Sequence, residues 1–339
     1  MGKPTISDLA RAAGVSPTTV SHAFSGRRHV DPETRERIHA LAREMGYHPN
    51  SAAQRLRSGR TGIIALASSM PFAIAAGPSR LGFLMEIAAS AAISALTRDI
   101  ALCLIPPQPP EKNLDMLGFD GVILVEPACD DPLVGHFEAR RTPVISIGKV
   151  PGREDIPAID LRSRDTALLL LDHLHQQGCR RIALVTGTSP RTSQIETRAA
   201  YRDFAAARAM PPEVLELDET GGEDLARARV RELLQVRPEL DGLMVPVDAF
   251  ASGALAAAHE LGRALPRDLR MVTRYDGLRA KLAAPPLTAV DLHLAQIAGM
   301  AVELLLDRID GKPRQVQAPR PTLVARRSSV ADDNGKLSS

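Results

Sequence analysis

Beyond residue 61, short apolar runs alternate with helical patterns, and this alternation limits the possible folds of the chain most strongly. The runs are rich in Ile, Leu and Val and span residues 63–68, 100–105, 121–126, 143–147, 181–187, 242–247 and 269–274. Helical patterns follow at residues 81–98, 165–178 and 251–263. This order predicts parallel strands covered by helices on both faces, arranged as two successive sheets. Ligands of such sheets bind beyond the carboxyl ends of the strands.

The first sixty residues differ from the rest of the chain in charge. They hold ten Lys and Arg against five Asp and Glu, although the 339 residues together carry a net charge of only +2. The remainder is mildly acidic. A basic head on an acidic body favours a polyanion as the partner of the head. Chance clustering on a solvated surface explains the charge alone equally well.

Three short helices are predicted in this basic segment. They span residues 5–14, 16–26 and 31–46. Each begins with a capping side chain and ends in glycine, as isolated helix ends commonly do. The capping residues are Thr5, Ser16 and Asp31, and the glycines are Gly14, Gly26 and Gly46. Pro17 and Pro32 occupy the first helical positions that proline tolerates.

The first two helices form a helix-turn-helix pattern, because only Gly14, Val15 and Ser16 join them. The apolar stripe of the second helix leaves four short side chains outward, which are Pro17, Thr18, Ser21 and His22. Short polar side chains let a helix lie deep in a major groove and bond to phosphates or base edges. A plain three-helix bundle with a wet outer face fits the pattern equally well.

A second basic segment follows at residues 50–60. Its short helical stretch, about residues 51–57, carries one large apolar side chain, Leu56, among arginines. A helix of this length is unstable alone. An apolar wedge flanked by arginines suits a DNA minor groove, where it can separate two base steps. A basic interdomain linker is at least as good an explanation of this segment alone.

Residues 5–60 closely resemble, almost without gaps, the head and hinge of the lactose-repressor/galactose-repressor (LacI/GalR) family of bacterial transcription regulators. The resemblance implies base reading by Pro17, Thr18 and His22. It implies minor-groove contacts by Ala53, Leu56 and Arg57. It implies phosphate contacts by Thr5, Ser16, Ser21 and Tyr47. Because Pro17 has no backbone N–H, we expect the base preference to depart from that of relatives at this position.

A weaker resemblance continues in QGCRRIALVTG, LGRALPRDLRMVTRYDG and PPLTAVDLHLAQIAGMAVELLLDRI. These segments are similar to the family's effector domain, whose fold is shared with periplasmic sugar-binding proteins. The resemblance implies a small all-α head followed by an α/β domain of two Rossmann-like lobes around a cleft. The expected divisions are a helix-turn-helix domain 1–49, a hinge 50–60, an effector-binding and dimerisation domain 61–339, an N-lobe of about 61–160 and 291–320, a C-lobe of about 161–290 and 321–330, and a flexible tail 331–339.

The resemblance also implies effector contacts. Asp276 in RYDG, Asp248 in PVDAFASGA and, less directly, Asp165 match polar cleft positions. Their carboxylates could accept hydrogen bonds from sugar hydroxyls or base N–H groups. Alternatively, Asp248 and Asp165 cap helices and Asp276 occupies a turn.

Two departures from the family pattern bear on the effector. Thr197 stands where many members carry an arginine, and Arg198 is one residue away. The loop after the first strand is unusual and adds Ser79 and Arg80. Arginines near the predicted strand ends suggest an anionic effector as one hypothesis. They are Arg80, Arg191, Arg198 and Arg274.

Several classes of protein lack their signatures here. The three cysteines are scattered and form no CxxC pair, so neither a disulfide framework nor a zinc site is expected. The sequence has no phosphate-loop, nucleophile-elbow or HExxH motif, so we expect no enzyme activity, no cofactor and no metal. No apolar run is long enough for a membrane span and no signal sequence is evident, which favours a cytoplasmic location.

The sequence therefore predicts a sequence-specific DNA-binding transcriptional regulator, most simply a repressor. A small-molecule effector (a sugar, sugar acid or similar metabolite) would control its affinity for double-stranded, pseudo-palindromic operator DNA. A homodimer is expected, since residues 331–339 carry no leucine heptads for a tetramer. The alternative is a small-molecule binding or transport protein with the same effector fold, which would not need the DNA-reading head.

Overall fold

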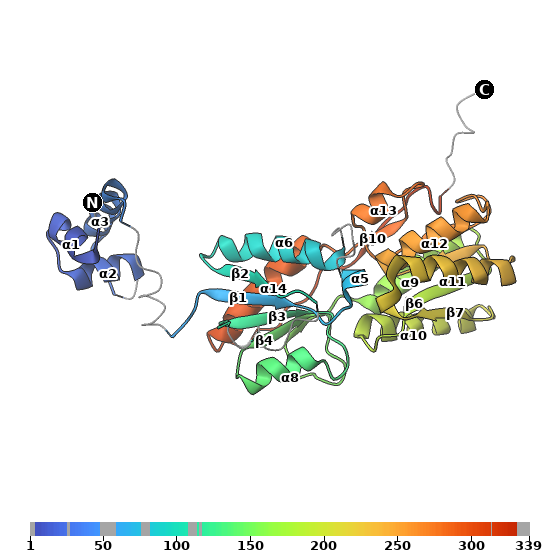
Figure 1. Cartoon of the computed structure of the whole chain (residues 1–339), viewed down its shortest axis with the longest axis horizontal. Coiled ribbons are helices and arrows are strands. Elements are labelled where there is room, and N and C mark those ends of the chain that lie inside the picture. Colours follow the sequence, from blue (N-terminus) through green and yellow to red (C-terminus); the bar gives the residue numbers. More distant parts are fainter. Residues whose placement is uncertain are drawn as a thin grey trace, which may run out of the picture. The chain divides into compact units, whose positions relative to one another are not determined.

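The computed structural model describes residues 4–25, 28–47, 59–75, 82–107, 114, 117–312 and 314–330. The chain divides into two compact units, Met1–Thr61 and Gly62–Ser339. The first is helical and the second is built from helices and parallel strands (Figure 1). Within the described part of the chain, every helix is too short or too polar to span a lipid bilayer.

The N-terminal unit contains the three predicted helices, α1 (Ile6–Ala13), α2 (Pro17–Ser25) and α3 (Pro32–Met45). Each contributes apolar side chains to one small core, centred on Leu9, Val20, Ile38 and Ala42. Leu9, Val20 and Ile38 are completely buried. The helical spacing of these residues therefore directs one face of each helix to a shared interior.

The predicted end signals are confirmed for α1 and α3. The Thr5 hydroxyl accepts a hydrogen bond from the backbone N–H of Asp8, whose carboxylate in turn bonds the N–H of Thr5. The Asp31 carboxylate accepts a hydrogen bond from the N–H of Thr34 at 2.8 Å. Gly14 and Gly46 end the two helices in the left-handed conformation, which glycine adopts without a steric penalty.

The first lobe of the second unit has a parallel sheet with strand order β2-β1-β3-β4-β5. Its strands are β1 (Ile63–Ala67), β2 (Ala101–Leu104), β3 (Gly121–Val125), β4 (Val144–Ile147) and β5 (Ala158–Ile159). Its helices are α5 (Phe72–Ala75), α6 (Phe83–Leu96), α8 (Pro132–Ala139) and α14 (Leu294–Ile309).

Alternation along the buried strands of this lobe builds a core on each face of the sheet. Ile64, Leu66 and Ile123 pack with residues of α6 and α14. Val122 and Leu124 point the other way and pack with residues of α8. Because successive strand side chains face opposite sides, continuous apolar runs such as GVILV require helices on both faces.

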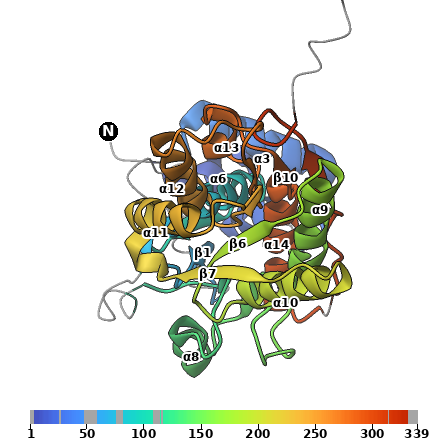
Figure 2. The same cartoon turned by 90° about the vertical axis from the view of Figure 1, so that its right-hand side faces the viewer.

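The second lobe has a parallel sheet with strand order β7-β6-β8-β9. Its strands are β6 (Ile182–Gly187), β7 (Glu213–Leu217), β8 (Gly242–Met244) and β9 (Arg270–Val272). Its helical elements are α9 (Ser163–Gln176), α10 (Thr192–Ala207), η1 (Glu219–Gly221), α11 (Gly222–Val236), α12 (Asp248–Glu260) and α13 (Leu278–Leu282). In Figure 2, α9 and α10 lie on one side of β6, and α11 and α12 lie on the other.

The chain passes between the lobes more than once. After the second lobe, β10 (Ala289–Asp291) leads to α14, which packs against α6 and the first sheet. β11 (Thr322–Val324) then returns antiparallel to β10 and leads to residues 325–330. There the Ser328 carbonyl accepts a hydrogen bond from the Met271 N–H in the second lobe. Each lobe is thus built from segments that are distant in the sequence.

The seven predicted strands are all present, with ends within three residues of the expected ones. The strand β7 was missed because its sequence, EVLEL, interrupts three apolar residues with two glutamates and lies mostly half-exposed at a sheet edge. The two-residue β5 and three-residue β10 and β11 are too short to leave a periodic signal. The predicted fold class, a helical head followed by a two-lobed α/β domain, is confirmed.

Candidate nucleic-acid interface and ligand cleft

The helix-turn-helix geometry of the N-terminal unit arises from a three-residue turn between α1 and α2. Gly14 has φ +65°, and the N–H of Val15 bonds the carbonyl of Ala10 at 3.0 Å. The Ser16 hydroxyl accepts a hydrogen bond from the N–H of Thr19 at 3.1 Å. The turn therefore closes α1 and caps the start of α2 within three residues.

The predicted base-reading residues lie on one short helix. Pro17 and Thr18 are exposed, whereas Ser21 and His22 are half-buried. Val20 and Ala23 fix the opposite face of α2 in the core. Pro17 and Thr18 lie in the first turn of α2, where free N–H groups also favour phosphate, whereas His22 lies in its last turn.

The predicted phosphate-contacting residues have different surroundings. The hydroxyls of Thr5 and Ser16 already bond within their own helix caps, Thr5 to Asp8 at 2.6 Å and Ser16 to Thr19 at 2.9 Å. Tyr47 is half-buried against Phe24, with ring centroids 6.0 Å apart. All lie at the surface of the head, and their roles toward DNA stay predictions.

Several predicted residues lie outside the described part of the chain. They are the hinge residues Ala53, Leu56 and Arg57 and the loop residues Ser79 and Arg80. Most of the hinge 50–60 and the tail 331–339 lie outside it as well.

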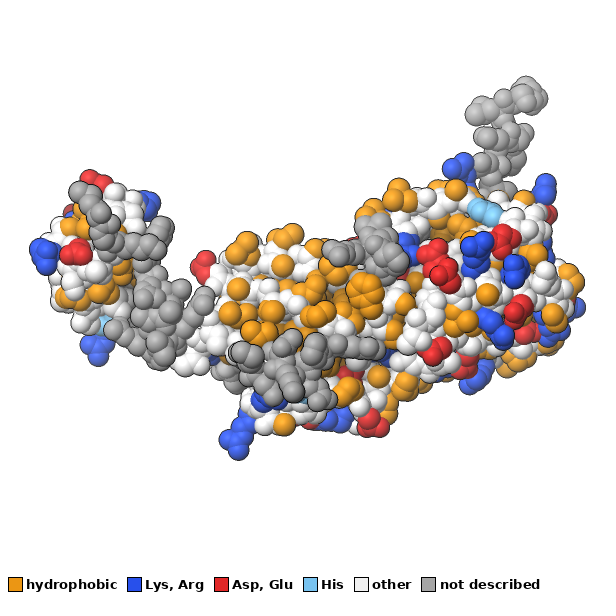
Figure 3. All heavy atoms as spheres, viewed as in Figure 1, with side chains coloured by type: hydrophobic (Ala, Val, Ile, Leu, Met, Phe, Trp, Pro, Cys, Tyr) orange, Lys and Arg blue, Asp and Glu red, His pale blue; other side chains and the backbone are white. Residues whose placement is uncertain are grey.

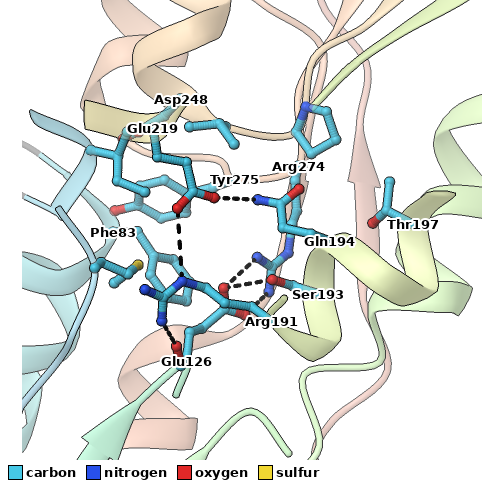
Figure 4. Close-up of a pocket in the computed structure, with 14 residues that line it drawn as sticks. Phe83, Glu126, Arg191, Ser193, Gln194, Thr197, Glu219, Asp248, Arg274 and Tyr275 are labelled. Carbon is cyan, nitrogen blue, oxygen red and sulfur yellow. Dashed lines mark hydrogen bonds and ion pairs between the residues drawn. The ribbon is translucent and has the colours of Figure 1, made fainter. Parts of the chain in front are cut away.

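In the second unit, one pocket lies between the two lobes, where strands β1, β3, β6, β7, β8 and β9 end. Its polar lining residues are Glu126, Arg191, Ser193, Gln194, Thr197, Glu219, Asp248 and Arg274 (Figure 4). Its apolar lining residues include Met70, Ile74, Phe83, Val247 and Tyr275. The Phe83 and Tyr275 rings meet edge-to-face, with centroids 5.6 Å apart. The location agrees with the rule that such sheets bind ligands beyond the strand ends.

Glu126 joins the two lobes at this pocket. It follows β3 in the first lobe, and its carboxylate accepts hydrogen bonds from Arg274 at 2.8 and 3.3 Å and from the Ser193 hydroxyl at 2.7 Å. Burial raises the pKa of this carboxyl, but the charge and hydrogen bonds of Arg274 outweigh burial, so its pKa lies below the usual range. Glu126 is therefore a buried carboxylate anion.

Arg191 forms a second set of contacts between the lobes. Its guanidinium donates to the Glu126 carbonyl and, at 3.3 Å, to the Ser69 hydroxyl, both in the first lobe. Its Nε lies 3.9 Å from a carboxylate oxygen of Glu219, a residue of η1 in the second lobe. Burial raises the pKa of Glu219, and nearby Arg191 opposes the rise.

Asp248 is the third carboxylate of the pocket. It is the first residue of α12 and is 8% exposed. Burial raises its pKa to about 6, opposed by Arg279. One carboxylate oxygen accepts the Ala249 N–H at 2.7 Å, and the other lacks a partner among the described residues. Buried polar atoms usually have hydrogen-bond partners, so an unpaired oxygen in a pocket is a feature that a ligand could satisfy.

Three other predicted effector residues belong to the described part of the chain, and none of the three lines this pocket. Asp276 forms ion pairs with Arg326 at 2.5 Å and Lys281 at 3.6 Å and lines a neighbouring polar cavity. Arg198 donates to the Gly187 carbonyl at 2.7 Å. Asp165 is exposed in the first turn of α9, 3.3 Å from Arg162. Of the predicted carboxylates, only Asp248 lines the pocket.

Sequence reasoning missed Glu126 and Glu219 as pocket residues. Glu126 ends the predicted strand 121–126, so its place at a strand terminus was a usable signal. Glu219 follows β7, the strand that was not predicted. Arg191 and Arg274 appeared only in the hypothesis of an anionic effector, and both line the pocket beside carboxylates.

The second unit thus combines two α/β lobes with a polar pocket between them, and the first unit is a helix-turn-helix head. Residues 5–50 match the family described as bacterial regulatory proteins, lacI family. Residues 171–329 match a periplasmic binding protein-like domain. Among the described residues, no group of three or more His, Cys, Asp or Glu side chains could hold a metal ion.

Full-length relatives share both parts. The HTH-type transcriptional regulator CelR of Thermobifida fusca is 29% identical, covering 91% of this chain and 93% of the relative. The HTH-type transcriptional regulator AglR of Rhizobium meliloti is 30% identical, and the match covers 80% of this chain and 78% of the relative. A solved complex of the transcriptional regulator CelR with cellobiose is 27% identical, with TM-score 0.70 and coverage of 96% and 99%.

The helix-turn-helix head, the pocket between the lobes and the full-length relatives together identify the chain as a DNA-binding transcriptional regulator rather than an enzyme. The chain belongs to the lacI family of bacterial regulatory proteins.

Proposed function

We propose that this protein is a repressor whose affinity for operator DNA is set by a small polar molecule bound between the lobes. The observation that carries the proposal is the pocket itself, which both lobes build and which contains buried polar atoms without a hydrogen-bond partner among the described residues. These atoms are Arg191 Nε, Asp248 Oδ2 and Arg274 Nε. They occur in the same chain as a DNA-reading head.

The proposed control follows from the origin of the pocket residues. Glu126 belongs to the first lobe, whereas Arg191 and Arg274 belong to the second, so a ligand that contacts both lobes favours one lobe arrangement. A ligand can shift such an equilibrium only by its difference in affinity for the two arrangements. A coupling of about 1–3 kcal/mol to operator binding is typical. Whether the ligand weakens or strengthens operator binding depends on which arrangement the DNA-bound dimer selects.

The pocket favours a neutral, hydroxyl-rich ligand over an anion. Two guanidiniums, Arg191 and Arg274, face three carboxyl groups. Arg274 pairs with the Glu126 carboxylate, and Arg191 lies 3.9 Å from the Glu219 carboxylate. An anion would find no unneutralised cation among these side chains, and Asp248 would disfavour it further. Aromatic and aliphatic lining residues such as Phe83 suit the apolar face of a sugar ring. The cellobiose complex of the relative CelR supports the same class.

On DNA, we propose that α2 enters the major groove and that Pro17, Thr18 and His22 read bases. Thr5, Ser16, Ser21 and Tyr47 would contact phosphates and fix the register. Ala53, Leu56 and Arg57, which lie outside the described residues, would contact the minor groove as a hinge. Two heads in a dimer would recognise a pseudo-palindromic operator.

A homodimer is proposed from exposed apolar side chains on α6 and α13. Ile93 and Leu96 of α6 are 68% and 72% exposed, and Leu282 of α13 is 74% exposed. Figure 3 shows hydrophobic side chains gathered on the face that includes α6. A soluble chain seldom exposes such a patch unless another protein surface covers it.

Sedimentation velocity tests the proposed dimer. The double variant Leu96→Glu/Leu282→Glu should be monomeric, whereas Val236→Glu, an exposed control on α11, should stay dimeric.

The central experiment is an unbiased selection of duplex oligonucleotides with the full-length protein. The selected operator is then titrated by fluorescence anisotropy with and without ribose, sucrose, cellobiose and gluconate. We expect a pseudo-palindromic consensus and a change in operator Kd of about 5–150-fold with one neutral sugar, as the typical coupling energy predicts. The absence of any consensus would refute DNA recognition. Ligand control would be refuted if a consensus operator is found but the affinity of the protein for it stays the same with every sugar in the panel and with a deproteinised cell extract.

A further inference from the structure

One ion pair in the pocket connects the lobes directly. Arg274 follows β9 in the second lobe, and its two terminal nitrogens donate to the two carboxylate oxygens of Glu126, which follows β3 in the first lobe. The side chains of Arg274 and Glu126 are only 10% and 7% exposed. A bidentate pair of this kind is geometrically specific and is screened little by salt at this depth.

The two partners are held unequally. Glu126 keeps other contacts without Arg274, because the Ser193 hydroxyl bonds its carboxylate at 2.7 Å and its N–H bonds the Ile147 carbonyl at 2.8 Å. Its backbone has φ +48°, a conformation that a non-glycine residue keeps only when the surroundings fix it. The hydrogen bonds of the Arg274 side chain, in contrast, all go to Glu126 among the described residues.

Arg274 also occupies space that a ligand needs. Its guanidinium carbon lies 5.4 Å from the centre of the Phe83 ring, so the cation is near an aromatic ring as well as the Glu126 carboxylate. The remaining free volume of the pocket is about 40 Å³. That volume holds roughly one to three water molecules, far less than a sugar needs. A ligand can enter only if Arg274 leaves or the lobes separate, and separation also breaks the Arg274–Glu126 pair.

We propose that Arg274 is a displaceable internal occupant of the effector pocket and keeps the lobes closed when no ligand is bound. The effector takes its place by presenting paired hydrogen-bond donors to Glu126, which stays fixed at the end of β3. The inference rests on the proposed function, since it assumes that this pocket binds the effector.

The proposal limits the chemistry of the effector. A group that replaces a guanidinium against a carboxylate must donate two hydrogen bonds, as adjacent sugar hydroxyls or a planar cation do. A carboxylate or phosphate group in the same position would be repelled by Glu126 once Arg274 has left. Arg274 therefore acts as a specificity-determining residue as well as a link between the lobes.

A backbone hydrogen bond provides a reporter of lobe closure that needs neither DNA nor effector. The N–H of Cys129 in the first lobe donates to the carbonyl of Pro190 in the second at 2.9 Å. Hydrogen–deuterium exchange of this amide speeds up whenever the lobes separate. Peptides from β1 and β6, inside each lobe, report instead on whether the lobes stay folded.

The test compares exchange at Cys129 in the full-length wild-type protein with that in Arg274→Ala, Glu126→Gln and the double variant. We expect either single substitution to speed exchange about tenfold or more, and the double variant to exchange no faster than the faster single variant. Peptides of β1 and β6 should stay protected. Arg270→Ala removes an arginine from β9 that does not line the pocket, so exchange at Cys129 should stay at the wild-type rate.

Chemical rescue tests the displacement step. Methylguanidinium at millimolar concentration should restore protection at Cys129 in Arg274→Ala and bind it saturably in calorimetry. It should do neither in the double variant, which lacks the Glu126 carboxylate, nor in wild type, where Arg274 occupies the site. Ribose, as a neutral polyol, forms a second arm and indicates whether hydroxyl donors alone can replace the cation.

Unchanged exchange at Cys129 in folded Arg274→Ala would show that the pair does not hold the lobes together. If Arg274→Ala also speeds exchange in the peptides of β1 or β6, the variant Arg274→Gln is used in its place. Exchange at Cys129 in Arg274→Gln and in Glu126→Gln then tests the proposal. Equal binding of methylguanidinium by wild type, Arg274→Ala and the double variant would also overturn the proposal. If methylguanidinium rescues Arg274→Ala as expected but no small molecule changes operator affinity, ligand control is refuted and the role of Arg274 in holding the lobes together is not.

Discussion

The substitution Leu9→Ala tests whether the small core of the head supports DNA recognition independently of the ligand-binding unit. Leu9 lies on α1, is completely buried and packs in the same cluster as Val20 and Ile38. The cluster consists of a few side chains from three short helices, so the head has little surplus stability. The matched control, Leu184→Ala, removes an equally buried leucine from β6 in the other unit.

The expected size of the effect follows from the burial of Leu9. Replacing a fully buried leucine by alanine costs about 2–5 kcal/mol, which combines lost transfer free energy and a cavity. A folded unit of this size, Met1–Thr61, at about 0.05–0.15 kcal/mol per residue, has a total stability of roughly 3–9 kcal/mol. A loss of about 3 kcal/mol would lower its melting temperature by about 12–24 °C. The substitution therefore removes much or all of the stability of the head.

The assay combines calorimetry with operator titration. Differential scanning calorimetry of the full-length variant should show the transition of the head shifted down and that of the ligand-binding unit unchanged. Operator affinity should fall at least tenfold at 37 °C and less at 15 °C, because folded heads become scarce on heating. Leu184→Ala should shift the other transition and leave the first in place.

A temperature-independent loss of operator affinity in Leu9→Ala would contradict this reasoning, because it would mean that Leu9 acts on the DNA contact itself. Full operator affinity at 37 °C with an unshifted transition would refute the proposed role of Leu9 in the core. Simultaneous loss of both transitions would mean that the two units do not unfold separately.

Three further predictions concern single residues. His22→Ala should relax base preference at one operator position, at a cost of about 1–3 kcal/mol; an unchanged selection profile would remove its base-reading role. Leu56→Ala should weaken specific operator binding more than non-specific binding, and equal losses in salt-matched titrations would argue against a wedge. Because burial raises the pKa of Asp248 from 3.8 to about 6, stability should fall as pH rises between these values, by up to about 3 kcal/mol. Asp248→Asn should lack this slope in urea titrations at pH 4 and 7.

The head could be predicted from sequence because local signals determine it. Caps, glycines and apolar spacing in residues 5–46 act over three or four positions. Accordingly, Thr5, Gly14 and Asp31 have the predicted roles in the structure. The strands beyond residue 61 are similarly visible, because two-sided burial requires continuous apolar runs.

The ligand pocket was less predictable because its contacts link distant parts of the sequence. Glu126 and Arg274 are 148 residues apart, and neither carries a local sign that it will be buried. Resemblance to the family favoured Asp276 as an effector contact. In the structure, its carboxylate forms ion pairs with Arg326 and Lys281 outside the pocket. Only the packing of the two sheets decides which strand-end residue faces the other lobe.

The chemistry of the pocket narrows the choice between a neutral and an anionic effector in a way that arginine positions alone could not. Arginines near strand ends suggested an anion. In the structure, however, Arg191 bonds the Glu126 carbonyl and lies 3.9 Å from the Glu219 carboxylate, and Arg274 pairs with the Glu126 carboxylate. A guanidinium already paired with a buried carboxylate offers an anion little attraction, because the anion must first break that pair. The burial that hides these arginines from solvent also fixes their partners, and the proposal of a neutral, donor-rich ligand rests on this pairing rather than on the count of charges.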